Sequence, residues 1–379
     1  MAEPVASGPV SGPVSGPVSV ALLLASSTGG VGQHVRSLAA GLVDRGVTVR
    51  VCGPVATDAL FGFAAAGASF RPVEIAASAR PVRAALAVRA LRRAVAGVDV
   101  VHVHGLRAGL LAGVALTGRR PPYVVSWHNA VLATGPAGRA ATLAERLVAR
   151  KADVSLAASA DLAARVTRLG GRDVRPLDVA APALAPPRRT PGQVRAELGA
   201  DGRPLVLCVA RLHPQKGLDT LVAAAAAWRA REPVPLTVIA GSGPLEPVLR
   251  AQVEAAGLPV RLIGRRTDVA DLLAAADVVV LPSRWEARAL AAQEALRAGR
   301  PLVATAVGGL PALLGNAAVL VPPDDPAALA AAVSRLLDHP AEAAALATRG
   351  VRRAGTWPDE AATVRRVAAV YAELTGRAV

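Results

Sequence analysis

The sequence predicts an α/β protein with two domains, each built on a parallel β-sheet that helices cover on both faces. Three observations lead to this prediction. The 379 residues exceed what one ordinary hydrophobic core holds. Strand-like apolar runs alternate with helix-like segments along most of the chain. A proline-rich stretch interrupts this alternation once, after which it restarts. We place the domains at residues 20–185 and 204–355, joined by a linker at 186–203.

The first domain follows an N-terminal tail. Residues 1–19 repeat SGPV, a composition that cannot build a core, and we expect them to be disordered. Continuous apolar runs typical of strands buried on both faces come next. They are VSVALLLASS, VTVRVCGP, VDVVHVHG, PYVVSWHN and ADVSLAAS. Between them, apolar periodicity predicts one helix that ends at Gly46 and three more at residues 82–96, 107–117 and 139–150.

The second domain repeats the pattern. Its predicted strands are PLVLCVARL, PLTVIAGSG, VRLIGR, DVVVLPS and PLVATAVGG. Its predicted helices cover residues 217–230, 244–256 and 268–275, and residues 356–379 form one last amphipathic helix. Ligands of such sheets bind at the carboxyl ends of the strands. With two sheets, we expect the site in a cleft between them.

Composition limits the function classes. Two cysteines without metal-type spacing, Cys52 and Cys208, indicate buried thiols in a reducing compartment. No apolar run approaches the ~18 residues of a membrane span, and the N-terminus lacks the basic region of a signal peptide. We therefore expect a cytoplasmic protein. The net charge of +15, larger in residues 1–185, favours an anionic partner. Scarce aromatics, 2% of the chain, argue against nucleic acid.

The loop ARLHPQKGLD, residues 210–219, follows the first strand of the second domain. It carries Arg211 and Lys216, and Lys216 is one of only two lysines in a chain that otherwise uses arginine. Fixed cations before a helix N-terminus suit a phosphate or diphosphate. The alternative is a pair of solvated surface charges. The next loop, AGSGP at 240–244, brings glycines that permit close backbone approach, although such a sequence is also an ordinary turn.

A third loop, PSRWEARALAAQEALRAGRP, places Glu286 and Glu294 in a helix-prone segment with seven residues between them. Eight residues of helix advance ~12 Å, too far for the two carboxyl groups to share one proton. The pair therefore does not fit a glycosidase, whose carboxyls flank a single bond. The alternative is a solvated helix face.

The order R-x4-K-G, G-S-G-P, P-S-x2-E-x7-E-A-x2-A-G-x-P and A-T-x-V-G-G-x-P-x-L resembles retaining glycosyltransferases of the GT-B fold, family 4-like. This group includes bacterial mannosyl-, glucosyl- and N-acetylglucosaminyltransferases. The resemblance covers residues 20–375 and is most specific at 205–315. It implies two Rossmann-like domains facing a cleft, with the helix at 356–379 crossing back to the first domain.

This resemblance implies that Glu286 accepts hydrogen bonds from hydroxyls of the donor sugar. It also implies that Glu294 accepts hydrogen bonds from the ribose hydroxyls of the nucleotide. Arg211 and Lys216 hold the diphosphate, and Gly243 allows its approach. Family members have Gly-Phe-Gly after the first glutamate, where this chain has Ala287, Arg288 and Ala289. If that loop requires positive φ, alanine is costly there. The amides of Arg288, Ala289 and Leu290 are expected to face the diphosphate. The Arg288 side chain either adds a phosphate contact or points to solvent.

The first domain carries the remaining candidates. STGGVGQH resembles the family's Gly-rich turn, with Gly29 and Gly30 approaching donor phosphates and acceptor. His128 of SWHN matches the histidine that contacts the donor sugar near the reaction centre, and His104 is a candidate on the acceptor side. We expect only one of His102 and His104 to face the cleft. For each histidine, a structural role is the alternative.

No Asp-x-Asp pair occurs, which argues against a metal clamp on the diphosphate, and we assign no metal ligand and no cofactor. The sequence thus predicts a hexosyltransferase that moves a sugar from a nucleoside diphosphate donor to an acceptor hydroxyl with retention. The basic half suggests a lipid-linked or phosphorylated acceptor and peripheral contact with anionic membrane at its inner face. A solvated face is the favoured interpretation of the arginine-rich helix at 82–96. The alternatives are an epimerase of nucleotide-sugars and a catalytically degenerate binder.

Overall fold

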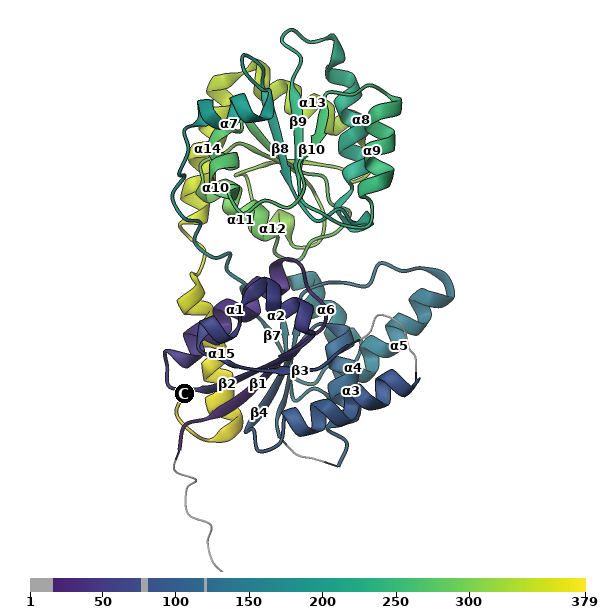
Figure 1. Ribbon diagram of the computed structural model, residues 1–379, viewed down its shortest axis with the longest axis vertical. Helices are drawn as coiled ribbons and strands as arrows, with labels where there is room; N and C mark the ends of the chain where they lie inside the picture. Colours follow the sequence, from purple (N-terminus) through teal and green to yellow (C-terminus); the bar gives the residue numbers. More distant parts are fainter. Residues whose placement is uncertain (1–15, 76–80, 119–120) are drawn as a thin grey trace, which may run out of the picture.

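The computed structural model describes residues 16–75, 81–118 and 121–379 and consists of two α/β lobes, one above the other in Figure 1. Residues 1–15 of the predicted tail lie outside the described residues. The first strand already begins at Ser19, within the range that the sequence assigned to that tail. No helix in the described ranges is long and apolar enough to cross a membrane.

The N-terminal lobe is built on a seven-stranded parallel sheet with the order β3-β2-β1-β4-β5-β6-β7. Its strands are β1 (Ser19–Leu24), β2 (Thr48–Gly53), β3 (Ser69–Pro72), β4 (Val100–His104), β5 (Tyr123–Trp127), β6 (Val154–Ala157) and β7 (Val174–Pro176). Its helices are α1 (Gly30–Val43), α2 (Val55–Phe61), α3 (Pro81–Ala94), α4 (Leu106–Ala115), α5 (Gly135–Lys151) and α6 (Ala160–Arg168). The central strands are almost wholly buried, as their uninterrupted apolar runs require.

The C-terminal lobe holds a six-stranded parallel sheet with the order β10-β9-β8-β11-β12-β13. Its strands are β8 (Leu205–Val209), β9 (Leu236–Ala240), β10 (Val260–Leu262), β11 (Val278–Leu281), β12 (Leu302–Thr305) and β13 (Val319–Val321). Its helices are α7 (Pro191–Leu198), α8 (Leu218–Ala226), α9 (Glu246–Ala255), α10 (Val269–Ala275), α11 (Leu290–Arg297), α12 (Leu310–Leu314), α13 (Pro326–Asp338) and α14 (Pro340–Ala354). The sequence had predicted neither α13 nor α14.

The strand order reverses between β1 and β4 in one sheet and between β8 and β11 in the other. Crevices at such switch points, beyond the carboxyl ends of the strands, are where open α/β sheets bind ligands. The Gly-rich turn, the Arg211–Lys216 loop and the Glu286 loop follow β1, β8 and β11 respectively. The topology therefore gathers the predicted site residues at these two points.

The predicted linker contains a helix. Thr190 caps α7 in a reciprocal capping box with Gln193, and Pro191 occupies its first turn. Val194 and Leu198, one helical turn apart, are buried in the core of the C-terminal lobe. The segment 186–203 therefore belongs largely to that lobe, because a good cap and two buried side chains outweigh its proline content.

The chain crosses between the lobes twice, and the second crossing ends in α15 (Glu360–Thr375), beside α1 in the lower lobe of Figure 1. Val367 and Tyr371 of α15 are fully buried in the core of the N-terminal lobe. A Cβ on Gly41 would lie 2.6 Å from a methyl group of Val364, so α1 and α15 approach closely. The last helix is thus an integral part of the first domain.

Candidate active site between the domains

The loops after β8 and β11 contact each other through their backbones. Gly217 has a φ of +59°, and a Cβ there would lie 2.0 Å from the carbonyl oxygen of Pro282. Gln215 donates to the carbonyl of Trp285 at 2.8 Å, and its own carbonyl accepts from the amide of Arg284 at 2.8 Å. These contacts fix Lys216 and Glu286 relative to each other, although 70 residues separate them in sequence.

Lys216 and Glu286 form an ion pair at the centre of this loop cluster. The Nζ atom lies 2.5 Å from Oε1 of Glu286, and the Ser283 hydroxyl donates to the same oxygen at 2.7 Å. The side chains of Lys216 and Glu286 are 17% and 7% exposed. A buried carboxylate requires such partners. The two predicted site residues thus meet directly, with Ser283 as a third member that the sequence did not single out.

Glycines of the AGSGP loop pack against the Arg211 loop. A Cβ on Gly241 would lie 1.8 Å from the carbonyl oxygen of Ala210, and one on Gly243 would lie 2.4 Å from that of Leu212. Arg211 itself is exposed, at the surface that the N-terminal lobe faces. The glycines therefore position the cation by allowing two loops to touch.

The residues after Glu286 adopt ordinary backbone conformations. In the described part of the chain, Asp324 is the only non-glycine residue with positive φ. Ala287, Arg288 and Ala289 are therefore unstrained, and the expected cost of replacing Gly-Phe-Gly does not arise. Positive φ occurs instead at Gly308, where a Cβ would lie 2.0 Å from the carbonyl oxygen of Glu286. The conformation of the Glu286 loop therefore depends on the close approach of Gly308 and not on glycines within the loop itself.

The Arg288 side chain lies elsewhere than the sequence led us to expect, reaching neither solvent nor the ligand side. Its Nε donates to the carbonyl of Val179 at 3.0 Å, and Nη1 pairs with Asp178 at 2.9 Å. The guanidinium carbon lies 5.9 Å from the ring centroid of Trp357. Asp178 and Trp357 belong to the two chain crossings between the lobes. The side chain is drawn there because Asp178 offers a carboxylate and Trp357 an aromatic face.

Glu294 projects from the second turn of α11. It is half-buried, and burial raises its pKa, an effect that the Arg297 cation opposes. Ala289 directly precedes α11, so the amides of Ala289 and Leu290 lie at its positive end. A half-buried carboxylate and backbone amides at a helix start are compatible with one elongated ligand that carries both hydroxyls and negative charge.

The Gly-rich turn of the N-terminal lobe meets the loops that follow β8 and β11 in the C-terminal lobe. A Cβ on Gly29 would lie 3.3 Å from Cδ of Arg211, and one on Gly30 would lie 3.1 Å from Cδ1 of Leu290. Trp285 reaches across as well, since its indole donates to Asp161 of α6 at 3.0 Å. We call this set of facing loops the interdomain site, comprising the Gly29–Gly30 turn and residues 210–217 and 282–290.

Four histidines cluster on the N-terminal side of the interdomain site. His104 Nδ1 lies 3.1 Å from Nε2 of His128, and the ring of His34 packs edge-on against both. Burial lowers the pKa of His34 to about 4 and holds those of His104 and His128 well below the usual range. The sequence did not single out His34. The only indication in the sequence was its place near the start of the helix that follows the Gly-rich turn.

The expectation that at most one of His102 and His104 faces the cleft rested on alternation along the strand, and that reason was wrong. Residues two apart on a strand point to the same face, and the two rings lie 4.4 Å apart. His102 is the deeper one, bonded to the hydroxyls of Tyr371 at 2.6 Å and Ser126 at 2.8 Å. It therefore ties β4 to α15, while His104 faces His128.

Two family models match this chain. Residues 29–180 match a model described as glycosyl transferase 4-like domain, and residues 203–339 match one described as glycosyl transferases group 1. The two matches correspond to the two lobes.

Individual proteins give the same result. The chain is 33% identical over 300 residues to D-inositol 3-phosphate glycosyltransferase 2 of Catenulispora acidiphila, covering 72% of this chain and 70% of that protein. It is 36% identical over 154 residues to alpha-D-kanosaminyltransferase of Streptomyces kanamyceticus, covering 39% and 40%. Among solved structures, Anabaena HepE in complex with UDP-glucose superimposes with a TM-score of 0.78 at 20% identity, covering 93% of this chain and 99% of that one. This last similarity concerns the fold.

Proposed function

The chain belongs to the glycosyl transferases group 1 family and is a glycosyltransferase with two Rossmann-like domains, and from this premise we propose which transfer it performs. It moves a hexose-type sugar from a nucleoside diphosphate donor to an acceptor hydroxyl, with retention of configuration and without a metal ion. The observation that carries the proposal is the Lys216–Glu286 pair, buried in the interdomain site opposite the Gly29–Gly30 turn.

Each end of the donor has its own contacts in this proposal. Glu294 accepts hydroxyls of the ribose, and Arg211, Lys216 and the amides of Ala289 and Leu290 hold the diphosphate. These groups oppose the charge that develops on the departing diphosphate, an electrostatic contribution that needs no metal. Glu286 then accepts hydroxyls of the sugar. Lys216 exchanges part of its contact with Glu286 for the phosphate, so donor binding opens a pair that is closed in the free protein.

The N-terminal lobe supplies the acceptor side. His128 lies next to the sugar at the reaction centre, with His104 behind it at 3.1 Å. Both imidazoles are neutral at physiological pH because burial lowers their pKa, so each offers either a donor or an acceptor to a hydroxyl. The contacts of Gly29 and Gly30 with Arg211 and Leu290 bring the lobes together and exclude water, which would otherwise hydrolyse the donor.

The acceptor carries a phosphate in our proposal. A groove of about 580 Å³ lies at the start of α5, lined among others by Arg139, Arg146 and Arg165. Arg165 is paired with Glu145 at 2.5 Å, whereas no partner of Arg139 or Arg146 is present among the described residues. The Catenulispora relative bears the name of an enzyme that acts on inositol 3-phosphate, which supports an acceptor of this class. The phosphate belongs either to a soluble compound or to a lipid at an anionic membrane surface.

A thermal-shift screen with UDP-, GDP- and ADP-sugars tests the donor assignment. We expect at least one donor to stabilise the wild type, and Lys216→Ala and Glu294→Ala to lose that shift. Because Lys216→Ala leaves Glu286 buried without its partner, each shift is measured from the variant's own midpoint. Arg250→Ala, which removes a surface pair on α9, is the control that keeps the shift. An unchanged shift in both site variants would remove the assignment.

Incubation with donor alone distinguishes the alternative functions. Epimerisation of the free nucleotide-sugar would support an epimerase, and donor binding without transfer to a broad acceptor panel would support a degenerate binder. For the acceptor, Arg146→Glu is expected to weaken transfer to inositol 3-phosphate and not to unphosphorylated inositol. Binding to vesicles that contain anionic lipid, if it weakens as salt increases, would indicate the lipid-borne source.

A further inference from the structure

Three histidines from three different elements converge in the N-terminal lobe. His34 lies in the first turns of α1, His104 ends β4, and His128 follows β5 directly. One nitrogen of each ring lies within 4.8 Å of one nitrogen of each of the other two. His34 and His104 are each 3% exposed, and His128 is half-buried. We call these three residues the histidine cluster.

Two nitrogens of the histidine cluster have no hydrogen-bond partner among the described residues. They are Nε2 of His34 and Nε2 of His104. A buried polar atom without a partner costs about 1–3 kcal/mol, and such atoms are rare in folded proteins unless an ion or a water satisfies them. Two unpartnered nitrogens in one cluster indicate a ligand that accepts lone pairs from several side chains at once.

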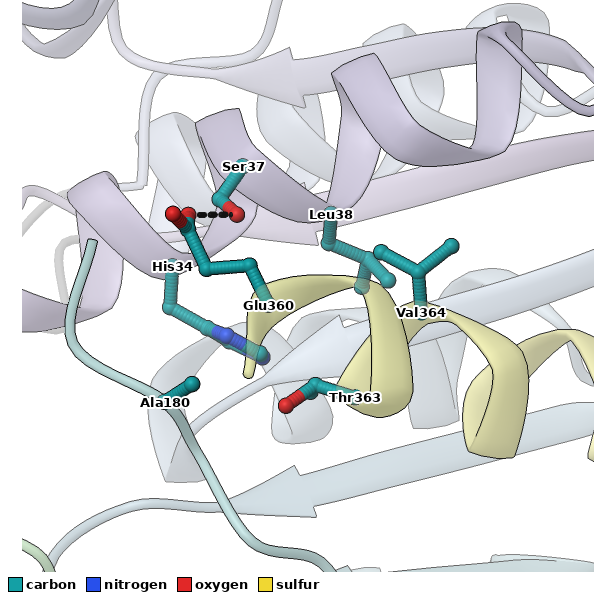
Figure 2. A pocket seen from close by; sticks show the side chains of 7 residues that line it. All are labelled: His34, Ser37, Leu38, Ala180, Glu360, Thr363 and Val364. Atoms are coloured by element: carbon teal, nitrogen blue, oxygen red, sulfur yellow. Dashed lines mark hydrogen bonds between the residues drawn. The ribbon is translucent and has the colours of Figure 1, made fainter. Parts of the chain in front are cut away.

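The electrostatics of the cluster favour a cation as that ligand. Imidazole nitrogens carry lone pairs that coordinate divalent transition metals. The narrow pocket beside His34 also contains the carboxylate of Glu360, which the Ser37 hydroxyl holds (Figure 2). That pocket contains no lysine or arginine to repel a cation.

We propose that the histidine cluster binds one divalent transition-metal ion of the Zn²⁺ type, and that the bound ion inhibits the enzyme. Three imidazoles at 2.0–2.1 Å from a tetrahedral zinc lie about 3.3 Å from one another. Nitrogens already within 4.8 Å reach that spacing by small side-chain rotations. The hydrogen bond between His104 and His128 breaks when their nitrogens bind the metal. A set of three nitrogens without oxygens does not suit Mg²⁺ or Ca²⁺.

Inhibition follows from the position of His128 and rests on the proposed function. The ion fixes the imidazole that we place beside the donor sugar. Its fourth ligand, such as a water molecule, then occupies space where the acceptor enters. The ion is therefore an inhibitor and not a cofactor, and the transfer reaction itself stays independent of metals.

Metal binding is measured on the untagged full-length chain after treatment with a chelator. Equilibrium dialysis against Zn²⁺ is expected to give one ion per chain, and Co²⁺ is expected to give the visible absorption of a tetrahedral nitrogen-ligated site. His34→Gln and His104→Gln are expected to weaken zinc binding at least about tenfold, as loss of one of three ligands does. His339→Gln, an exposed histidine between α13 and α14, is the matched control with unchanged binding. Circular dichroism confirms that each variant is folded.

Equal zinc binding by His34→Gln and His339→Gln, or no binding by the wild type, overturns the site. This readout needs no activity, so it is independent of the proposed function. In the transfer assay, Zn²⁺ is expected to inhibit the wild type reversibly, and His34→Gln is expected to require about tenfold more Zn²⁺ for half inhibition, each protein being compared with its own turnover without metal. Zinc bound to the cluster with unchanged turnover overturns the inhibitory role.

Discussion

At the scale of single residues, His102 links the pH dependence of stability to the fold. It is fully buried between the hydroxyls of Tyr371 and Ser126. Burial, with a smaller effect of His34, lowers its pKa from the ordinary 6.5 to about 3. The unfolded chain therefore binds a proton below pH 6.5 that the folded chain does not. The free energy of unfolding is at its full value above pH 6.5 and falls as the pH drops toward 3.

Below pH 6.5 each such histidine removes ~1.4 kcal/mol of unfolding free energy per pH unit. His34, His104 and His128 shift in the same direction and add to the slope. We predict that His102→Gln has a shallower decline of unfolding free energy between pH 7 and pH 5 than the wild type, measured by urea unfolding. Carboxylates of the unfolded chain titrate below this window. Parallel declines in the two proteins would show that His102 is protonated when folded.

Gly217 tests whether loop contact positions Lys216. Its φ of +59° and the 2.0 Å that would separate an added Cβ from the Pro282 oxygen both exclude alanine without movement. We predict that Gly217→Ala lowers the free energy of unfolding by more than about 1 kcal/mol and abolishes the donor-induced thermal shift. Gly202, with a φ of +66° and no heavy atom within 4 Å of such a Cβ, is the matched control. Gly202→Ala shares the backbone strain without the clash and is expected to keep the shift. Loss of the shift in both variants would count against positioning by contact.

The sequence indicated some of these residues and not others, for physical reasons. Lys216 and Glu286 were predictable because each follows a strand of a parallel sheet, and such strand ends meet at one edge. His34 and Ser283 were not singled out, because their importance depends on neighbours from other elements. The direction of the Arg288 side chain was unpredictable for the same reason, since Asp178 lies 110 residues away in sequence.

At the scale of elements, apolar runs predicted the central strands well because those strands are buried on both faces. Prediction failed where composition and local chemistry disagree. The segment before α7 is rich in proline, yet Thr190 and Gln193 form a complete capping box and the helix buries Val194. Helices α13 and α14 are rich in alanine and were not predicted, although their apolar and polar faces differ at least as much as those of α1 and α3, which were.

Helix α15 makes one polar contact in the core of the N-terminal lobe that a single substitution can test. Tyr371→Phe leaves Nδ1 of His102 buried without a partner. We predict a loss of about 1–3 kcal/mol in the free energy of unfolding, measured by urea unfolding at pH 7.5. Donor affinity is expected to stay unchanged, because Tyr371 is buried in the core of the N-terminal lobe and bonds His102 instead of a residue of the interdomain site. An unchanged midpoint would mean that His102 finds another partner, and a changed donor affinity would mean that α15 affects the interdomain site.

At the scale of the whole molecule, one guanidinium connects the two chain crossings with the loop that carries Glu286. Arg288 follows Glu286 by two residues, bonds Asp178 and Val179 where the chain leaves β7, and faces Trp357 where it returns. Its side chain is 11% exposed, so these contacts are largely shielded from solvent. Gln293 of α11 adds bonds to Val179 and Ala181. Because the loop that carries Glu286 is tied to the crossing segments, we expect the angle between the lobes and the position of Glu286 to be coupled.

This coupling makes Arg288 a positioning residue, and a double-mutant cycle tests it. We predict that Arg288→Met raises the KM for the donor about tenfold, equivalent to ~1.4 kcal/mol, with a smaller change in kcat. Arg288→Lys restores only part of the effect, because an ammonium cannot bond Asp178 and Val179 in the same fork. Asp178→Asn reproduces the change, and the double variant is no worse than either single one, since both remove one interaction.

Arg366 is the matched control for that cycle. It also pairs with Asp178, at 3.0 Å, but its side chain is 54% exposed and belongs to α15 alone. A surface pair of this kind contributes about 0–1 kcal/mol, so Arg366→Met is expected to leave the donor KM nearly unchanged. If the effects of Arg288→Met and Asp178→Asn simply add, the two residues act separately, and the loop that carries Glu286 is not coupled to the crossing segments. An equal effect of Arg366→Met would place the coupling in α15 instead of the Glu286 loop.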